Sequence, residues 1–500
     1  MKKLLLFGFL LIVTTLMNAQ RPIVTKWNTQ INSINSKEIT IYTQGSYTYT
    51  YIKADDASVT ASGNGNDGAT TIDFPQVGEY IVSIKPAGVF KFNSGNYKLI
   101  QLSQWGDVNW DTNLQYMFSG CTYLKITATD IPDFSNVTST YYMFNQCSAL
   151  TTVPSINSWN TSNVTDMSGM FINCSQFNQN IENWDVSKVN DMSGMFKGAS
   201  SFNQNIGNWN TSNVTNMSSM FESASLFNKP IGNWNVSNVT NMSRMFYQSE
   251  LFNQPIGSWD VSNVTEMSLM FYITPFNQPI GDWDVGNVEM MAGMFLLAKS
   301  FNQPLANWNV EKVKNMSYML GSTSFNQNLG NWNIKSINTT DVQFGTYSLQ
   351  GIFSNSLMDC QNYLKTLKGW SENPDTPNNQ RLSTSGVRYG ADGQIYRDAL
   401  TNIKGWFISE DIYSETCNST LFSTEIEKRG IQLYPNPAAD IINLSEEVSN
   451  IRIIDISGKI VKKISTLEKS INISKLAKGT YIITATTKTG DTINKKFIKE

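Results

Sequence analysis

The sequence predicts a mostly β protein with short helical turns, in which a solenoid of about ten coils is flanked by a small N-terminal and a small C-terminal β-sandwich domain. A string of about 25 residues recurs through the middle of the chain, which is the signature of a solenoid. Alternating apolar and polar stretches bounded by Gly turns lie on both sides of it. The composition is 40% hydrophobic and 15% charged over 500 residues, enough for several cores in a soluble chain.

The repeat is defined by aromatic residues at fixed spacing. Its fullest copy, residues 226–250, reads LFNKPIGNWNVSNVTNMSRMFYQSE. Tryptophans recur at steps of 24 or 25 residues, at Trp159, Trp184, Trp209, Trp234, Trp259, Trp283, Trp308 and Trp332. Ten coils are marked by Phe118, Phe144, Phe171, Phe196, Phe221, Phe246, Phe271, Phe295, the substitute Leu320, and Phe344. Stacking is expected because no such unit can bury its own apolar face.

One unit is predicted as a strand, a turn, a helical turn and a return. Trp234 and Val236 are spaced to point the same way from a short strand, toward the core. Met242, Met245 and Phe246 then follow the spacing of one face of a helical turn.

The opposite side of this predicted strand carries polar rows. Because solenoids commonly bind partners along such a face, we take the rows as candidate ligand-binding residues. They are Asn208, Asn210, Ser212, Asn233, Asn235, Ser237, Ser258, Asp260, Ser262, Asp282 and Asp284. The alternative is that any exposed strand face must be polar, with no ligand implied.

The residue content excludes most catalytic chemistry. The chain has no histidine, so Ser-His-Asp and Cys-His mechanisms and histidine-containing metal sites are excluded. A carboxylate glycosidase needs a paired acid, but Asp260 and Asp284 are replaced by Asn235 and Asn309 in sister coils. We therefore expect no enzyme activity, no catalytic residue, no metal site and no cofactor.

The five cysteines fall into two groups. Cys121, Cys147 and Cys174 each follow a coil phenylalanine by three residues, which predicts small buried side chains. Cys360 and Cys417 flank the segment after the repeats, and the sequence leaves open whether they pair.

Charge and targeting signals point to export. The formal net charge of −3 offers no attraction to nucleic acid, but residues 114–345 carry −6 and residues 425–500 carry +4. Residues 1–19 combine Lys2 and Lys3, an apolar run and Ala19, which predicts a secretory signal peptide. We expect no transmembrane segment in the mature chain.

Three further segments flank the repeats. Residues 20–100 hold Tyr- and Thr-rich alternating strands with Gly turns, which predict a β-sandwich. Residues 346–420 hold NYLKTLKGW and YRDALTNIKGWF, two short helices each ended by Gly, which predict a cap and linker. Residues 425–500 hold two strand pairs with turns at residues 457–458 and 489–491, a second β-sandwich.

The string W-D/N-V-S-N-V-T-N-M-S-x-M-F resembles the leucine-rich repeat of BspA-like surface proteins. The resemblance implies a leucine-rich-repeat-like solenoid over residues 101–345, a PKD-like domain over residues 20–100 and a cap after the repeats. Val239 stands where such repeats usually have Asn or Cys, so their usual asparagine ladder is expected to be absent.

The order LYPNP, GKIV, KGTYII and KFIK resembles the type A sorting domain of the type IX secretion system. The resemblance implies the type IX secretion machinery as a partner and passage across an outer membrane, followed by retention at the surface or release. The residues that carry it are Tyr434, Pro435, Asn436, Pro437, Gly458, Gly479 and Tyr481.

Together these features predict an exported, non-enzymatic repeat protein, secreted or on the outer face of the cell. Its polar rows are expected to mediate adhesion to, or recognition of, a host or environmental protein or glycan. The alternative is a structural surface spacer without a specific ligand.

Overall fold

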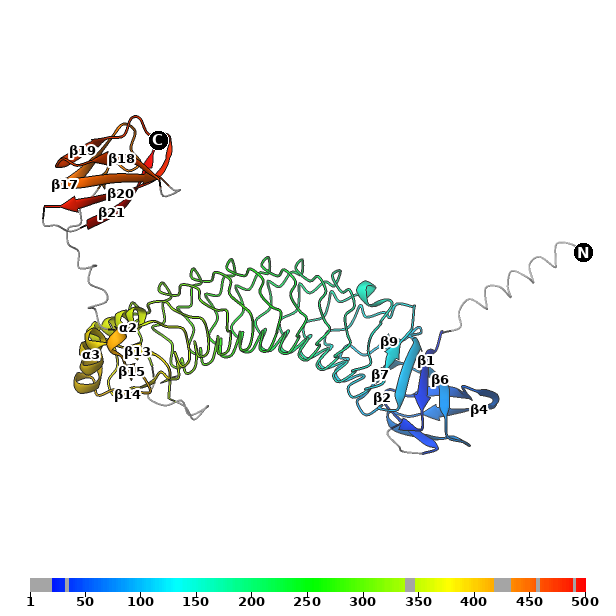
Figure 1. The fold of residues 1–500 in the computed structure, drawn as a ribbon. Coiled ribbons are helices and arrows are strands. Elements are labelled where there is room, and N and C mark those ends of the chain that lie inside the picture. The colour runs from blue at the N-terminus through cyan, green and yellow to red at the C-terminus, as the bar shows by residue number, and fades with distance from the viewer. Residues whose placement is uncertain (1–19, 32–35, 338–346, 418–432, 456–458, 489–491) are drawn as a thin grey trace, which may run out of the picture. The chain divides into compact units, whose positions relative to one another are not determined.

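The computed structural model describes residues 20–31, 36–337, 347–417, 433–455, 459–488 and 492–500. They belong to two compact units, Met1–Asn418 and Ser419–Glu500, and the secondary structure is mostly β with few helices, as predicted (Figure 1). The predicted signal peptide, Phe344, Gly458 and the turn at residues 489–491 lie outside these ranges. No helix within them is long and apolar enough to cross a membrane.

Two sheets share one core at the start of the first unit. Their orders are β10-β8-β1-β6-β3-β4 and β5-β2-β7-β9. The strands are β1 (Ile23–Asn28), β2 (Glu38–Gln44), β3 (Tyr47–Lys53), β4 (Asp56–Gly65), β5 (Gly68–Asp73), β6 (Glu79–Pro86), β7 (Val89–Phe92), β8 (Leu99–Gln104), β9 (Asn109–Trp110) and β10 (Lys125–Ile126). The rings of Tyr47 and Phe90 meet edge-on across the core at 5.8 Å.

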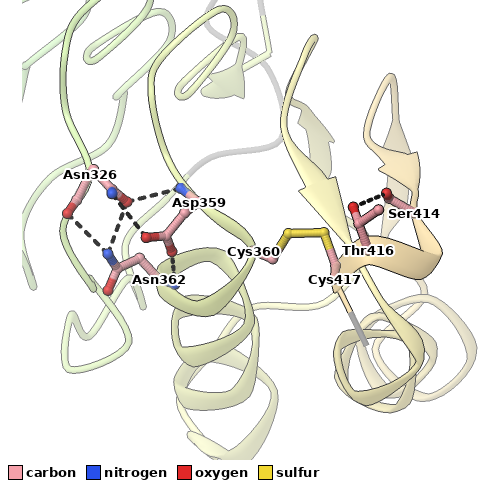
Figure 2. The surroundings of a disulfide bond; sticks show 7 residues. All are labelled: Asn326, Asp359, Cys360, Asn362, Ser414, Thr416 and Cys417. Atoms are coloured by element: carbon pink, nitrogen blue, oxygen red, sulfur yellow. Dashed lines mark hydrogen bonds between the residues drawn. A yellow bond between two sulfur atoms is a disulfide. The ribbon is translucent and has the colours of Figure 1, made fainter. Parts of the chain in front are cut away.

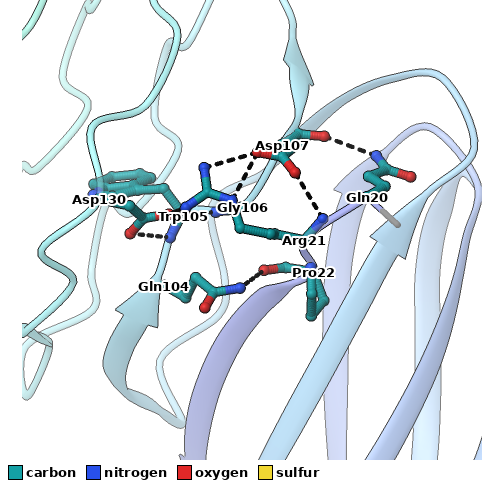
Figure 3. A network of polar contacts seen from close by, with 8 residues as sticks. All are labelled: Gln20, Arg21, Pro22, Gln104, Trp105, Gly106, Asp107 and Asp130. Atoms are coloured by element: carbon teal, nitrogen blue, oxygen red, sulfur yellow. Dashed lines mark hydrogen bonds and ion pairs between the residues drawn. The ribbon is translucent and has the colours of Figure 1, made fainter. Parts of the chain in front are cut away.

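A polar network joins this region to the first coil (Figure 3). The Arg21 guanidinium forms an ion pair with Asp107 at 2.7 Å. Asp130 accepts hydrogen bonds from the backbone N–H groups of Trp105 and Gly106 at 3.0 and 2.9 Å. Since β10 also pairs in parallel with β8, the repeats begin as a continuation of the first sheet.

The coils stack through one isolated parallel bridge each. The bridges connect Asn113, Ser139, Asp166, Asp191, Asn216, Asn241, Glu266, Met290 and Asn315 in succession. Inside, equivalent aromatic rings form columns, with Trp209 parallel to Trp234 at 6.5 Å. Trp234 is 3% exposed and its indole N–H donates to the Ile206 carbonyl at 2.9 Å. The predicted burial of Trp234 and Val236 is confirmed.

The prediction of a strand and a helical turn within each coil is wrong, because the structure forms turns at both places. Residues 231–239 form tight turns, and residues 242–249 form consecutive turns closed by i to i−3 bonds from Met245, Tyr247 and Ser249. The alternate N–H groups donate to the next coil, from Met242, Arg244, Phe246 and Gln248. A helix would direct these N–H groups into its own i to i−4 bonds, so the stacking pattern excludes it.

The cap continues the parallel pairing of the coils. Strands β11 (Leu349–Gln350), β12 (Arg381–Ser383) and β14 (Phe407–Ser409) form one parallel sheet, and β13 (Arg388–Tyr389) pairs with β15 (Ile412–Tyr413). Helix α2 (Cys360–Glu372) runs through Gly369, so this glycine does not end it as predicted. A Cβ on Gly369 would lie 2.1 Å from the Gly330 carbonyl oxygen, so the glycine permits close contact with the last coil.

A disulfide and an ion pair hold the cap together. Cys360 and Cys417 are bonded, which answers the question that the sequence left open (Figure 2). Helix α3 (Ala391–Asp398), which leads into a π-helical turn at Ala399–Ile403, carries Arg397. Its guanidinium binds both oxygens of Asp411 at 2.9 and 3.0 Å, and the Asp411 side chain is 1% exposed.

The second unit has its own core. Its strands are β16 (Leu433–Tyr434), β17 (Ile441–Asp455), β18 (Ile460–Ile464), β19 (Glu468–Asn472), β20 (Gly479–Thr487) and β21 (Thr492–Lys499). The long strand β17 pairs with β16, β18, β19 and β20, so it connects nearly all of the described strands. The core includes Ile442, Leu444, Ile453, Ile483 and Phe497.

We expect Trp234→Ala to lower the free energy of unfolding by about 3–5 kcal/mol, because it removes a buried ring and its hydrogen bond between coils. Asn233→Ala, at an exposed position in the same coil, should change it by less than about 0.5 kcal/mol. Urea unfolding followed by tryptophan fluorescence measures both. Equal losses in the two variants would contradict this arrangement.

Thiol labelling tests the cysteine assignment. Cys121, Cys147 and Cys174 are buried and free, and burial raises the pKa of the Cys121 thiol to about 12. We expect iodoacetamide to label none of these three thiols rapidly in the native chain and all three in urea. Reduction in urea should raise the number of labelled thiols to five, which is the number of cysteines in the sequence. A fast-labelling native thiol would contradict the burial.

Candidate binding surface

The structure places the predicted ligand-binding residues on the surface of four successive coils. Those of the two outer rows are exposed: Asn208, Asn233, Ser258 and Asp282, and Asn210, Asn235, Asp260 and Asp284. The serines are half-buried: Ser212, Ser237 and Ser262. They occupy turns and the unpaired backbone between turns, because the parallel bridges fall later in each coil.

The Asn and Asp row also stabilises the turns. Asn235 Oδ1 accepts hydrogen bonds from the backbone N–H and the hydroxyl of Ser237, at 3.0 and 2.8 Å. The Ser262 hydroxyl and the Ser262 backbone N–H, which donates to Asp260 at 3.1 Å, hold the pKa of Asp260 below its ordinary value. Short side chains with an acceptor oxygen favour such turns, which accounts for Asn and Asp here. One acceptor oxygen of each of these residues is thus already engaged inside the coil.

A ladder of asparagine amides runs through the coils at the Asn228 position, which is not the Val239 position where the sequence predicts that the usual ladder is absent. Asn228 Oδ1 accepts from the Asn253 backbone N–H at 3.1 Å and from the Gln254 amide at 2.8 Å. The bond recurs from coil to coil among Asn178, Asn203, Asn228, Asn253, Asn277, Asn302 and Asn326. At its end, Asn326 bonds to Asp359 and Asn362 of helix α2 (Figure 2). The repeated Phe-Asn-Gln triplet is the signal that could have located it.

The consecutive turns present a second surface that the sequence reasoning missed. We call three equivalent positions of each coil on these turns the turn columns. Their side chains range from exposed, as at Arg244, to buried, as at Glu222. The first column holds Tyr116, Tyr142, Gly169, Gly194, Ser219, Arg244, Leu269, Gly293, Tyr318 and Gly351. The second holds Ser119, Asn145, Ile172, Lys197, Glu222, Tyr247, Tyr272, Leu296, Gly321 and Ser354. The third holds Gly120, Gln146, Asn173, Gly198, Ser223, Gln248, Ile273, Leu297, Ser322 and Asn355.

Every residue of the first and third turn columns has a positive φ. Glycine and asparagine adopt this conformation readily, whereas other residues lose about 1–2 kcal/mol each. The chain nevertheless places Leu269 there with φ 58° and the β-branched Ile273 with φ 52°. Unlike the tryptophan slot, these columns change residue type from coil to coil, and that variation is the signal that could have identified them.

Large side chains gather in two parts of the turn columns. Near the first coils, the rings of Tyr116, Tyr141 and Tyr142 lie 4.5–5.6 Å apart. Farther along, Tyr247 stacks on Tyr272 at 4.5 Å with 17° between the planes. We call the second group the Arg244 patch. It consists of Arg244, Tyr247, Leu269, Tyr272 and Ile273.

The residues predicted for sorting lie in the second unit. Asn436 lies beside the outer edge of strand β21, where its Oδ1 accepts from the Ile498 N–H at 2.9 Å and its amide donates to the Lys496 carbonyl at 3.3 Å. Tyr481 is 8% exposed and its hydroxyl donates to the Ala477 carbonyl at 2.9 Å. Tyr434 is 50% exposed, and Gly479 begins strand β20. The structure thus gives Asn436 and Tyr481 structural roles.

Nothing in the described ranges brings together a metal-binding group of three or more Cys, Asp or Glu side chains. The three free cysteines instead donate inside the core. Cys147 Sγ donates to the Phe118 carbonyl at 3.1 Å, and Cys174 Sγ to the Phe144 carbonyl at 2.9 Å. Ser249 donates from the same slot to the Phe221 carbonyl at 2.7 Å. The slot therefore suits a small side chain, which is Ala at Ala199 and Ala224 and can donate where it is Cys or Ser.

These features define a repeat protein followed by a separate β-sheet unit. Comparison with known families agrees on both parts. Residues 112–213, 174–274 and 273–351 match the family described as Mycoplasma protein of unknown function, DUF285. Residues 432–500 match the secretion system C-terminal sorting domain. The chain is therefore a repeat protein with a type IX secretion sorting tail, and this tail marks a secreted or cell-surface protein.

A 69-residue stretch is 32% identical to beta-agarase D of Zobellia galactanivorans. That stretch is 14% of this chain and 14% of the agarase, so the similarity spans about one seventh of either protein. No solved structure matches the chain.

The Asx turns give the rows a measurable contribution to stability. We expect Asn235→Ala to lower the free energy of unfolding by about 1 kcal/mol, because the turn loses two hydrogen bonds. Asn235→Asp keeps an acceptor oxygen, as Asp260 does in the next coil, and should restore most of the loss. Chemical denaturation of both variants tests this, and Asn235→Ala as stable as the parent would show that the bonds contribute nothing.

Proposed function

We propose that the repeat array is a non-enzymatic recognition module, displayed outside the cell, which binds a host or environmental protein or glycan by many weak contacts. The observation that carries this proposal is the regular exposure of equivalent side chains. Asn208, Asn233, Ser258 and Asp282 repeat along the surface of adjacent coils. An array with many equivalent contacts on a cell surface gains avidity from multivalent use.

The finer identity of the domains belongs to the same proposal. We infer a leucine-rich-repeat-like array of the BspA-like type, preceded by a PKD-like domain and a cleaved signal peptide. One parallel bridge per coil and a shared aromatic core support the first part. Two sheets around one core support the second.

A binding screen tests recognition against the spacer alternative. The purified full chain is presented to arrays of glycans and extracellular-matrix proteins, and each hit is titrated. Recognition predicts saturable binding, and the polar rows predict that Asn233→Ala combined with Ser258→Ala weakens it. A protein that saturably binds no member of either array would favour the spacer.

A turnover assay tests the absence of enzyme activity. We expect no detectable cleavage of any glycan in the array by the purified chain. Cleavage that is abolished by a single substitution such as Asp260→Asn would contradict the proposal and indicate a carboxylate mechanism.

Export depends on the tail in this proposal. We expect deletion of residues 425–500 to leave the array folded but trapped in the periplasm, because the tail has its own core and carries no part of the array core. Cell fractionation with protease treatment of intact cells measures the location, and circular dichroism of the truncated chain measures its fold. Truncated protein at the surface in normal amount would contradict the role of the tail, and unfolded truncated protein would contradict its independence.

A further inference from the structure

We propose that the Arg244 patch on the turn columns binds a protein partner that presents a carboxylate among apolar side chains. This deepens the proposed recognition function, on which it rests, and assigns it to a surface other than the polar rows.

Two branched residues of the patch adopt a strained backbone conformation. Coils fold with glycine in the first turn column, as Gly194 and Gly293 show, so the coil itself requires no side chain there. Leu269 and Ile273 nevertheless adopt φ of 58° and 52° in a region where branched side chains are outliers. Residues held against their backbone preference concentrate at ligand-contact sites. Their side chains therefore serve a contact outside the coil.

The side chains of the patch are packed against one another and against the next coil. The Arg244 guanidinium carbon lies 5.1 Å from the centre of the Tyr247 ring, and Tyr247 stacks on Tyr272. The Leu269 side chain covers the next coil, since a Cβ on Gly293 would lie 2.6 Å from Leu269 Cδ2. Packing against neighbouring coils thus holds these side chains in place. A preordered platform loses little conformational entropy when it binds.

Arg244 gives the patch an exposed positive charge. In the adjacent coils Lys197 is already paired with Glu222 at 2.9 Å. Arg244 is exposed, and no ion pair joins it to a carboxylate of the described chain. An unpaired guanidinium beside aromatic rings suits a partner carboxylate, which it can bind with two parallel hydrogen bonds. The surrounding array carries −6, so a broadly acidic partner would be repelled and a single carboxylate within an apolar surface fits best.

The residue types in the Arg244 patch favour a protein partner over a glycan. The patch itself combines Arg244 with Tyr247 and Tyr272, and tyrosine supplies a large, rigid contact area in protein-binding loops. Tyr and Arg are also the residues that concentrate binding energy in protein interfaces. Leu269 and Ile273 offer a sugar ring neither an aromatic face nor a hydrogen bond. A protein surface is therefore the occupant that the patch favours.

A displayed library of random linear peptides provides the probe. Peptides are selected on the full chain, and their dissociation constants are measured by calorimetry. We expect selected peptides to contain Asp or Glu beside aromatic or branched residues. The double variant Arg244→Gly, Leu269→Gly should weaken their binding by about tenfold or more, as expected for hot-spot residues. Its melting temperature should stay the same or rise, because relief of the positive φ at two positions offsets the packing that Leu269 loses over Gly293.

Ser219→Gly is the matched control, since it makes the same change in the same column without removing a large side chain, and it should keep full affinity. Peptides that bind the double variant as tightly as the parent would overturn the proposal. The proposal would also be overturned if the library contained no binder, or if the double variant lost affinity together with a lower melting temperature. A saturable glycan ligand that needs the patch would overturn the protein assignment alone. Binders that need Asn233 instead would leave recognition standing and remove this patch from it.

Discussion

The pairing of backbone N–H groups between neighbouring coils is the constraint on which the array depends. In residues 242–249 alternate N–H groups close turns within the coil, and the others donate to the carbonyls of the next coil. A buried backbone donor without a partner is costly, so each coil needs a neighbour in this register. The register then stacks Trp on Trp and Phe on Phe, which buries the apolar face that no single coil can bury.

The same constraint explains why both ends of the array are closed. At the start, the first sheet supplies a paired strand through β8 and β10. At the end, β11, β12 and β14 continue the parallel pairing, and Asp359 and Asn362 bond to the last asparagine of the amide ladder. The disulfide between Cys360 and Cys417 then ties the start of α2 to the end of the cap. Each end thus satisfies donors and acceptors that an open coil would leave unpaired.

Much of the core could be predicted from the sequence because a fixed period identifies it. Trp234, Val236 and the cysteine slot follow from spacing alone. The turn geometry could not be predicted, because the spacing of Met242, Met245 and Phe246 also fits a helix. Only the backbone pairing with a neighbouring coil excludes the helix. The predicted rows proved exposed, yet their Asn and Asp residues also hold turns together. The turn columns could not be predicted from the repeat, because a repeat is recognised by residues that stay the same and the members of these columns differ between coils.

Variation in the turn columns is limited by contact between successive coils. The Tyr142 ring lies over Gly169, since a Cβ there would come within 2.4 Å of it, and Tyr318 lies over Gly351 in the same way. At these two steps a large ring requires a glycine in the next coil, whereas Tyr116 is followed by Tyr142 and Arg244 by Leu269, so contact constrains particular pairs of residues in successive coils. Because the core residues lie elsewhere, such a pair can change without disturbing the aromatic columns. A repeat array of this kind can thus vary its surface while it conserves its own fold.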